Sequence, residues 1–389
     1  MRSLLGRFHR PNTRSQTEQL FMLNSLGDGS TLSLDFTTGV LDPRVSFTRS
    51  TNATYINSSG YVTSAAINEA RFDYDPTAST PKGLLIEASA INLLNWSESF
   101  ATSGGTNNNW ADTSITRTTG QADPANGTTA IRFTASAGNA TVISSAAIGT
   151  SAQRTFSVWL RRVTGTGNIQ YTTDNGTTWT TQAITSSWVR YTFAATTAAQ
   201  RVGIQIVTGG NAIEMWGAQL EAGSGASSYI PTGANQATRS ADDCQLLDLA
   251  TMGFNASAGT IFTDVGVRLN TGSQRNYTFL PASGTNNQIF EGSGTAFHVY
   301  SNGSFVAQLG SSPLSASKIA AAYAVNDYAV SVNGGAVSTD TAGALPTSLT
   351  KLTIGGSIAN AAAYANGCIR TFKYWPTRLP DATLKSLST

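Results

Sequence analysis

Along most of this chain, apolar residues alternate with polar ones at a period of two, the pattern of strands with one buried face. In SVWLRRV (157–163) and WVRYTFA (188–194), apolar residues alternate with arginine or threonine. Turns rich in Gly, Asn and Ser separate such segments, and Asn302-Gly303 and Asn333-Gly334 are strong hairpin signals. The predicted strands are Leu32–Phe36, Ser46–Arg49, Ala53–Ile56, Leu84–Ile86, Ala130–Thr134, Thr155–Arg161, Ile169–Thr172, Thr178–Thr181, Trp188–Phe193, Val202–Val207, Ala212–Ala218, Thr260–Arg268, Asn276–Leu280, Gln288–Glu291, Ala296–Tyr300, Phe305–Gln308, Ala320–Ala324, Asp327–Val332, Lys351–Ile354 and Cys368–Tyr374.

The pattern predicts an all-β fold of tandem β-sandwiches in four parts: an N-terminal anchor arm (1–31), a small β-rich connector (32–95), a jelly roll (96–243) and a second sandwich (244–389). Seven or more strands at this spacing are typical of a jelly roll. The connector has many turns, including a hairpin turn at Asn57–Gly60, and little core of its own. We therefore expect it to pack on its neighbour or on another subunit. Helices are expected only at Gln16–Asn24 and Asp381–Leu387.

Composition narrows the choice of partners. Charged residues make up 12% of the chain, and its net charge is +2. Nucleic acid and acidic membranes need a strong basic excess, so neither is expected as a partner. With 40% hydrophobic and 9% aromatic residues, the chain is not of the disordered class. The N-terminal arm is locally basic, and we expect it to dock on a neighbouring chain, with a solvated tail as the alternative. Its basic residues before Glu18 are Arg2, Arg7, His9, Arg10 and Arg14.

Neither a signal peptide nor a membrane helix is predicted. The first residues have no apolar stretch of signal-peptide length, and no run approaches ~20 apolar residues. We therefore expect synthesis in the cytoplasm without membrane insertion. Only two cysteines, Cys244 and Cys368, occur. They flank the last sandwich, so a bridge is geometrically possible, but free thiols are expected in a reducing compartment.

Three sets of segments resemble known families. LDFTTGVLDPRVSFTRS, INEARFDYDP and KGLLIEASAINLL resemble a segment of tailed-bacteriophage structural proteins. NWSESF, DPANGTTAIRFT and WGAQLEAGSGASSYIPT resemble the jelly-roll module that follows it in phage fibres and head spikes, a module similar to carbohydrate-binding modules. YAVSVNGG, LTKLTIGGS and GCIRTFKYWPTRLPDATLKSL resemble a laminin-G or concanavalin-like sandwich. Together these matches span nearly the whole chain after Leu32.

This resemblance implies a virion surface protein, a tail or head fibre or spike that mediates host attachment. Its N-terminal region would bind other virion proteins of the capsid or tail. Phage fibres are commonly trimeric, so a homotrimer is expected, and a host surface glycan is the expected ligand. A capsid decoration or tail structural protein without a ligand is the alternative, and a polysaccharide depolymerase is a distant one.

One local motif is sharp. Residues 172–179, TTDNGTTW, fit the Asp-box pattern of sialidase propellers, S/T-x-D-x-G-x-T-W. A propeller needs several copies, and this chain carries one. We interpret the motif as a tight hairpin in which Asp174 bonds turn amides, Gly176 takes a positive φ and Trp179 packs beneath.

Catalytic and metal chemistry find little support. Glycoside cleavage needs two carboxylates at a set separation, and the acids here are few and scattered. No G-x-S-x-G nucleophile motif and no phosphate-binding loop occurs. His9 and His298 lack second ligands at metal-binding spacing, and His298 is interpreted as a plain sandwich residue. The laminin-G resemblance leaves calcium at Asp264 or Asp327 as an alternative. We expect no enzyme, no cofactor and no metal.

Sugar binding is the main functional candidate. Sugars stack on exposed aromatic faces, and Trp110 follows a run of three asparagines in a polar loop. Tyr171 and Trp179 are expected to face each other across a hairpin. These three residues are the candidate sugar contacts, although a buried position is the alternative for Trp110. The remaining tryptophans in alternating strands are interpreted as core, namely Trp159, Trp188 and Trp216.

Overall fold

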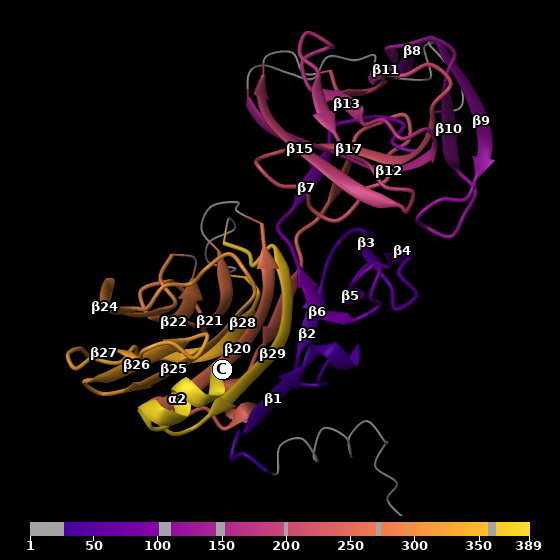
Figure 1. The fold of residues 1–389 in the computed structure, drawn as a ribbon. Helices are drawn as coiled ribbons and strands as arrows, with labels where there is room; N and C mark the ends of the chain where they lie inside the picture. Colours follow the sequence, from indigo (N-terminus) through magenta and orange to yellow (C-terminus); the bar gives the residue numbers. More distant parts are fainter. Residues whose placement is uncertain are drawn as a thin grey trace, which may run out of the picture.

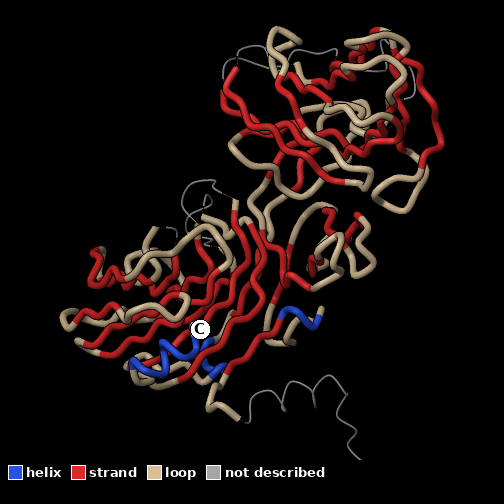
Figure 2. Tube along the Cα trace, in the orientation of Figure 1, coloured by secondary structure: helices blue, strands red, loops and turns tan. Residues whose placement is uncertain are grey.

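The computed structural model describes residues 27–100, 110–144, 152–197, 201–269, 274–292, 294–356 and 363–389. Its secondary structure is almost entirely strand, arranged as two sandwiches with a small hairpin beside the junction between them (Figures 1 and 2). The predicted all-β fold of tandem sandwiches is therefore confirmed. The predicted arm and the helix at Gln16–Asn24 lie outside the described residues, apart from residues 27–31.

The jelly roll consists of two five-stranded sheets packed face to face. Its core is formed by the inward residues of both sheets, including Phe133, Phe156 and Ile204. The first sheet has the order β15 (Val189–Thr197), β12 (Ala152–Thr164), β17 (Ala212–Ala222), β10 (Ala130–Ala135) and β9 (Ile115–Gln121). The second has the order β14 (Thr180–Gln182), β13 (Ile169–Thr172), β16 (Gly203–Ile206), β11 (Ala140–Ser144) and β8 (Trp110–Thr113).

The second sandwich, called the large sandwich here, has an eight-stranded and a seven-stranded sheet. The eight-stranded sheet has the order β27 (Ser338–Asp340), β26 (Asp327–Val332), β25 (Ser317–Ala324), β20 (Ala258–Arg268), β29 (Gly367–Trp375), β6 (Pro81–Ile86) and β5 (Phe72–Tyr74), and β1 (Leu32–Asp35) also pairs with β29. The seven-stranded sheet has the order β2 (Ser46–Thr48), β19 (Asp243–Leu246), β28 (Leu349–Ile354), β21 (Arg275–Pro281), β22 (Gln288–Gly292), β23 (Phe297–Ser301) and β24 (Ser304–Leu309).

Strands from the predicted connector are thus integral to the large sandwich. β1 and β6 both pair with β29, and β2 pairs with β19. Leu34, Phe47 and Leu84 belong to the same core as Tyr374 of β29. This pairing differs from a division that separates 32–95 from 244–389, because it joins strands whose paired residues are between 195 and 342 positions apart in the sequence. The connector does pack on a neighbour, but the neighbour is the C-terminal part of the same chain.

The chain leaves the large sandwich after β6, builds the jelly roll and returns. The outgoing β7 (Ala90–Asn92) and the returning β18 (Ala237–Arg239) pair as a two-stranded ribbon. A hairpin of β3 (Ala53–Ile56) and β4 (Val62–Ala65), called the connector hairpin here, lies beside this ribbon (Figure 1).

Three short helical segments complete the described chain. The 3-10 turns are η1 (Phe36–Thr38) and η2 (Leu249–Met252). Helix α2 (Asp381–Leu387) follows Pro380 as predicted, and its Leu384 is buried in a small cluster with Trp375. No helix in these residues is both long and apolar enough to cross a membrane.

Candidate functional site

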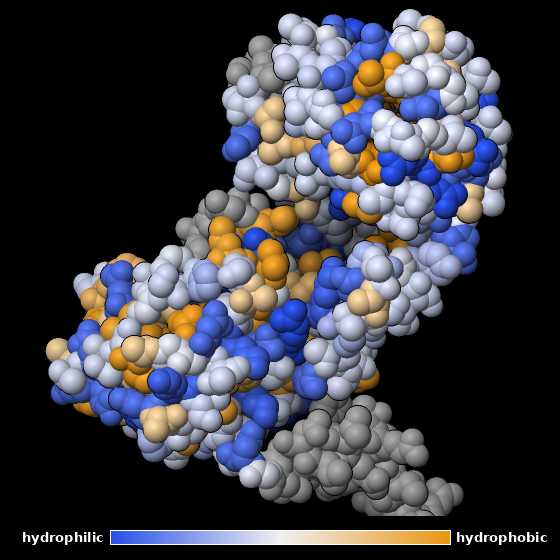
Figure 3. Space-filling model, viewed as in Figure 1, coloured by the Kyte–Doolittle hydropathy of each residue, from blue (hydrophilic) through white to orange (hydrophobic). Residues whose placement is uncertain are grey.

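A cleft of about 770 Å³ lies where the jelly roll, the connector hairpin and the large sandwich meet. Figure 3 shows the hollow between the two lobes, where apolar side chains gather on the visible face. All three parts contribute to its walls, so the cleft exists only when they are assembled. Its lining includes Tyr55, Tyr61, Asp73, Asp75, Lys82, Glu87, Asp123, Trp159, Trp188, Val189, Arg190, Ser227, Val267, Leu269, Asn366 and Arg370.

Aromatic rings form part of the cleft wall. Tyr55 and Trp188 are half-buried, and Tyr61 is 39% exposed. Behind them, Trp159 is buried, with its ring centroid 5.1 Å from that of Trp216. The Arg161 guanidinium lies 4.8 Å from the centroid of the Trp188 ring. The cleft thus offers partly exposed rings backed by a rigid aromatic cluster.

A tight turn brings Tyr61 to this position. The Asn57 side chain accepts hydrogen bonds from the amides of Ser59 and Tyr61, and the Gly60 amide donates to the Asn57 carbonyl at 2.9 Å. Gly60 has φ +81°, and a Cβ there would lie 2.6 Å from the Pro76 carbonyl oxygen. The predicted hairpin turn at Asn57–Gly60 is confirmed, and it turns Tyr61 toward solvent.

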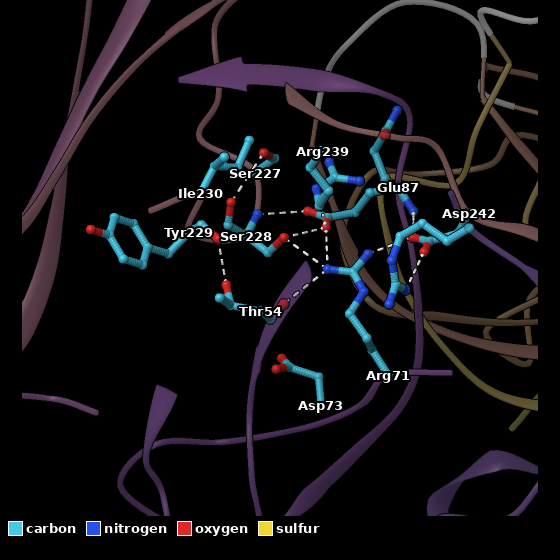
Figure 4. Close-up of polar contacts among 12 residues, drawn as sticks. Thr54, Arg71, Asp73, Glu87, Ser227, Ser228, Tyr229, Ile230, Arg239 and Asp242 are labelled. Atoms are coloured by element: carbon cyan, nitrogen blue, oxygen red, sulfur yellow. Dashed lines mark hydrogen bonds and ion pairs between the residues drawn. The ribbon is translucent and has the colours of Figure 1, made fainter. Parts of the chain in front are cut away.

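A buried ion network lies next to the cleft, and Glu87 is the member of this network that lines it (Figure 4). The Arg71 guanidinium is fully buried, donates to Glu87 at 2.8 Å and also contacts Asp242. The second Asp242 oxygen accepts from Arg49 at 3.0 Å, and Arg239 lies 3.5 Å from Glu87. Buried charges need such partners, and here the partners link residues 49–87 to residues 239–242.

The network also fixes the ionisation state of its acid. Burial raises the pKa of Glu87, but the positive charges of Arg239 and Arg71 and the hydrogen bonds from Ser228 outweigh burial and lower it to about 2. Both Glu87 oxygens accept hydrogen bonds, including one from the Ser228 amide at 2.8 Å. A carboxylate held in this state cannot donate a proton at neutral pH.

The other carboxylates of the cleft also accept hydrogen bonds from groups of the protein itself. Asp73 accepts from the Ile56 amide at 2.7 Å and from Lys82 at 2.8 Å. Asp75 accepts from two turn amides, which lower its pKa. Burial raises the pKa of Asp123, but hydrogen bonds from the amides of its own turn outweigh this effect and lower it. Each acid therefore has a structural role in a turn, an ion pair or the network.

The structure corrects the sugar-contact candidate at Trp110. The indole is completely buried, and the Phe100 ring packs edge-on with centroids 5.1 Å apart. Trp110 opens β8, whose inward face belongs to the jelly-roll core, so it presents no face to a ligand. The preceding asparagines lie outside the described residues.

The other two candidates do not face each other. Tyr171 lies across from Thr180, not Trp179, and stacks on Phe193 at a centroid distance of 3.8 Å. Neither Tyr171 nor Trp179 lines the cleft. The register places neighbouring positions on opposite faces of the hairpin, which explains their separation.

The Asp-box segment folds as the predicted tight hairpin. Asp174 accepts from the Thr178 amide at 2.9 Å, and Gly176 has φ +78°. A Cβ on Gly176 would lie 3.3 Å from the Trp179 ring, so the indole packs closely over the turn. The motif is a structural hairpin here.

Two aromatic residues were missed, and one was misassigned. Trp188 was interpreted as core but is half-buried in the cleft wall, whereas Trp159 and Trp216 are core residues. Tyr55 and Tyr61 were not singled out. Tyr61 directly follows a predicted turn, and that position was the available signal for its exposure.

The residues considered for metal binding or a disulfide bond are packed in the core or paired with other side chains. His298 is buried and stacks on Phe290 with a centroid distance of 4.4 Å. Asp264 pairs with Arg370, and Asp327 pairs with Arg378. Both cysteines are buried free thiols. Within the described ranges, no group of three or more His, Cys, Asp and Glu is suited to hold a metal ion.

Neither a known protein family nor a curated protein matches the chain. Among solved structures, CBM40 of the Ruminococcus gnavus IT-sialidase, bound to α2,3-sialyllactose, is 15% identical over 35% of this chain and 84% of its own, with a TM-score of 0.31. The NanB sialidase of Streptococcus pneumoniae is 14% identical over 36% of this chain and 26% of its own, with a TM-score of 0.31. Domain 4 of the Geobacillus stearothermophilus arabinanase AbnA, in complex with arabinotriose, is 12% identical over 43% of this chain and 82% of its own, with a TM-score of 0.31. Similarity at this level carries no functional inference for the chain.

Proposed function

We propose that this protein is a non-catalytic glycan-binding protein and that the cleft is its binding site. The observation that carries the proposal is the set of partly exposed rings, Tyr55, Tyr61 and Trp188, gathered in one cleft of about 770 Å³. Concave sites with aromatic walls and a few fixed polar groups are the usual form of small-ligand sites. Sugar rings have an apolar face that suits such walls and hydroxyls that suit the neighbouring polar groups.

The fixed carboxylates support binding without bond cleavage. A glycosidase needs one acid that can donate a proton and a second carboxylate as base or nucleophile. Glu87 has a pKa of about 2, and Asp73 is paired with Lys82. A polysaccharide depolymerase acting at this cleft would need a proton donor that these groups do not supply.

We further propose that the protein is a fibre or spike on the surface of a tailed-bacteriophage virion, made in the host cytoplasm and mediating host attachment. The sequence resemblance described above supports this role, with the N-terminal region bound to capsid or tail proteins. A homotrimer is part of the proposal. It rests on the resemblance alone, because the core-forming apolar side chains of residues 32–86, such as Leu34, Phe47 and Leu84, are buried within their own chain. Light scattering of a stable monomer at micromolar concentration would contradict the trimer.

Multivalent display tests the binding proposal. Weak sites repeated over many copies bind through avidity, so the full chain is coupled to beads and offered host cells and their surface polysaccharide. Tyr61→Ala and Trp188→Ala are each expected to weaken binding about tenfold, ~1.4 kcal/mol, with the fold intact. Phe305→Ala is the matched control, because Phe305 is 51% exposed and does not line the cleft.

Two results would redirect the proposal. Beads that bind no host would favour a structural virion component without a ligand. Shortening of the polysaccharide during the assay would show that the protein is an enzyme.

A further inference from the structure

Resting on the glycan-binding function, we propose that the cleft selects an uncharged glycan that carries N-acetyl groups on its sugars. The inference combines two features of the cleft, the pairing of its charged groups and an aliphatic wall exposed to solvent. Neither feature was needed to propose glycan binding itself.

The first feature is that Lys82, Arg370 and Glu87 of the cleft have charged partners within the protein, whereas Asp75 and Asp123 accept hydrogen bonds from turn amides. Lys82 is 2.8 Å from Asp73, and Arg370 is 3.1 Å from Asp264. Glu87 belongs to the buried ion network. An anionic or cationic sugar would have to compete with these internal partners, whereas an uncharged sugar would not.

Arg190 differs from these paired groups, because uncharged groups hold it in place of an ion pair. It donates to two uncharged acceptors, the Ser227 carbonyl at 2.7 Å and the Ser157 hydroxyl at 2.9 Å. Its guanidinium lies 4.6 Å from the centroid of the Trp159 ring. The side chain is therefore held against the cleft wall by uncharged groups, and its direction is set by them.

The second feature is an aliphatic wall. Val267 is 72% exposed and Val189 is 38% exposed, and both line the cleft together with the half-buried Leu269. The pairing of β20 with β29 shifts register between Val265 and Arg268, which releases Val267 from the inward-facing pattern of its strand. In Figure 3, apolar side chains gather in the hollow between the lobes.

These features together define the ligand chemistry. A sugar ring can lie against Tyr61 or Trp188 while a methyl group reaches the aliphatic wall. Plain hexoses carry only hydroxyls and leave Val267 and Val189 uncovered. An acetamido group supplies a methyl group without a charge, and burying one methyl is expected to strengthen binding about fourfold. N-acetylated hexosamine is therefore the sugar class that fits both features.

Three oligosaccharide series with the same β-1,4 backbone test this inference: N-acetylglucosamine, glucosamine and glucose oligomers of equal length. Calorimetry or competition on beads with the full chain should show the acetylated series binding at least fourfold tighter than the glucose series. The cationic glucosamine series should bind no tighter than glucose. Tyr61→Ala should weaken the acetylated and glucose series alike.

Val267→Thr isolates the aliphatic wall, because it keeps the shape of the side chain and adds a hydroxyl. It should remove most of the preference for the acetylated series, so that the ratio of acetylated-series to glucose-series affinity falls toward one. Val325→Thr is the matched control, since Val325 is 60% exposed and does not line the cleft. It should change neither affinity.

The outcomes separate this inference from the function on which it rests. Equal binding of the acetylated and glucose series, or tighter binding of glucosamine, would overturn the inference and leave glycan binding standing. Binding of host polysaccharide but of none of the three series would also overturn it. Failure to bind any glycan, including the host polysaccharide, would overturn the proposed function itself.

Discussion

At the scale of single residues, the place of a tryptophan relative to its strand decides whether it is buried in a core or partly exposed. Trp110 is completely buried, whereas Trp188 is half-buried in the cleft wall. Trp110→Ala is therefore expected to lower the free energy of unfolding by about 3–5 kcal/mol, as for other large core aromatics. Denaturant unfolding followed by circular dichroism measures this change.

Trp110→Phe is the matched control. It keeps an aromatic ring in the core and removes an indole N–H that has no hydrogen-bond acceptor among the described residues. It is expected to cost much less than Trp110→Ala. Equal losses for the two variants, or no loss for Ala, would contradict the core assignment.

The lowered pKa of Glu87 leads us to expect that the stability of the fold depends on pH. Its pKa is lowered from 4.5 to about 2 in the fold, so the carboxylate stabilises the folded state above pH 4.5. This contribution, on the order of 3 kcal/mol, is lost as the pH falls from about 4.5 to about 2. In Glu87→Gln, the free energy of unfolding should be lower at pH 7 and should fall less steeply across this range. A parallel pH profile in the two proteins would contradict the role of Glu87.

The ion network is a part of the site that could not be predicted from the sequence. Arg49 and Asp242 are 193 positions apart, and Arg71 and Asp242 are 171 apart. Alternation of apolar and polar residues says nothing about such pairs, because a charged residue in a strand is read as facing solvent. The same limit concealed the cleft, whose lining residues are spread between Thr54 and Arg370 in the sequence.

At the scale of elements, the Asp-box hairpin owes its shape to one carboxylate. Asp174 Oδ1 accepts from the Thr178 amide and from the Thr172 hydroxyl at 2.8 Å. Asp174→Ala should therefore raise the hydrogen-exchange rate of the Thr178 amide and destabilise the hairpin by about 1–2 kcal/mol. Asp174→Asn keeps a side-chain oxygen and should retain most of the protection. Unchanged exchange in the Ala variant would show that the turn does not depend on the Asp174 carboxylate.

The predicted strands were found in the structure, whereas others were missed, including β9 (Ile115–Gln121), β11 (Ala140–Ser144) and several shorter strands. β13 has the predicted bounds, and β12 extends the predicted strand at both ends. The missed β5, β7 and β18 have three residues each, too few to show a period. β7 and β18 pair with each other across 145 positions, so tertiary pairing determined them, whereas β5 pairs with the neighbouring β6.

At the scale of the whole molecule, two sandwiches could be predicted, but the path of the chain through them could not. The sequence order suggests modules in a row. The structure instead places the jelly roll between two parts of the large sandwich, which share one core. Pairing between β1 and β29 decides this arrangement, and neither strand carries a local signal for its partner.

This topology predicts that the jelly roll can be removed. The chain leaves and returns through the paired strands β7 and β18, with Asn92 opposite Ala237. Replacing residues 93–236 by Asn-Gly should close this ribbon as a two-residue hairpin, because that sequence favours the type I′ turn. The ionic partners Arg71, Glu87 and Asp242 all remain in the shortened chain, so the large sandwich should still unfold cooperatively in denaturant.

Deleting residues 27–86 is the contrasting variant, because it removes β1, β2, β5 and β6 together with Arg49 and Arg71. Glu87 and Asp242 would lose these buried partners, and removing one partner of a buried pair typically costs 3–5 kcal/mol. The C-terminal strands would also lose neighbours in both sheets. We expect this variant not to fold, although its C-terminal sequence is complete. Cooperative unfolding of the variant without residues 27–86 would show that the large sandwich does not need its N-terminal strands. Failure of the variant without the jelly roll to fold would show that those strands are not sufficient for the large sandwich to fold.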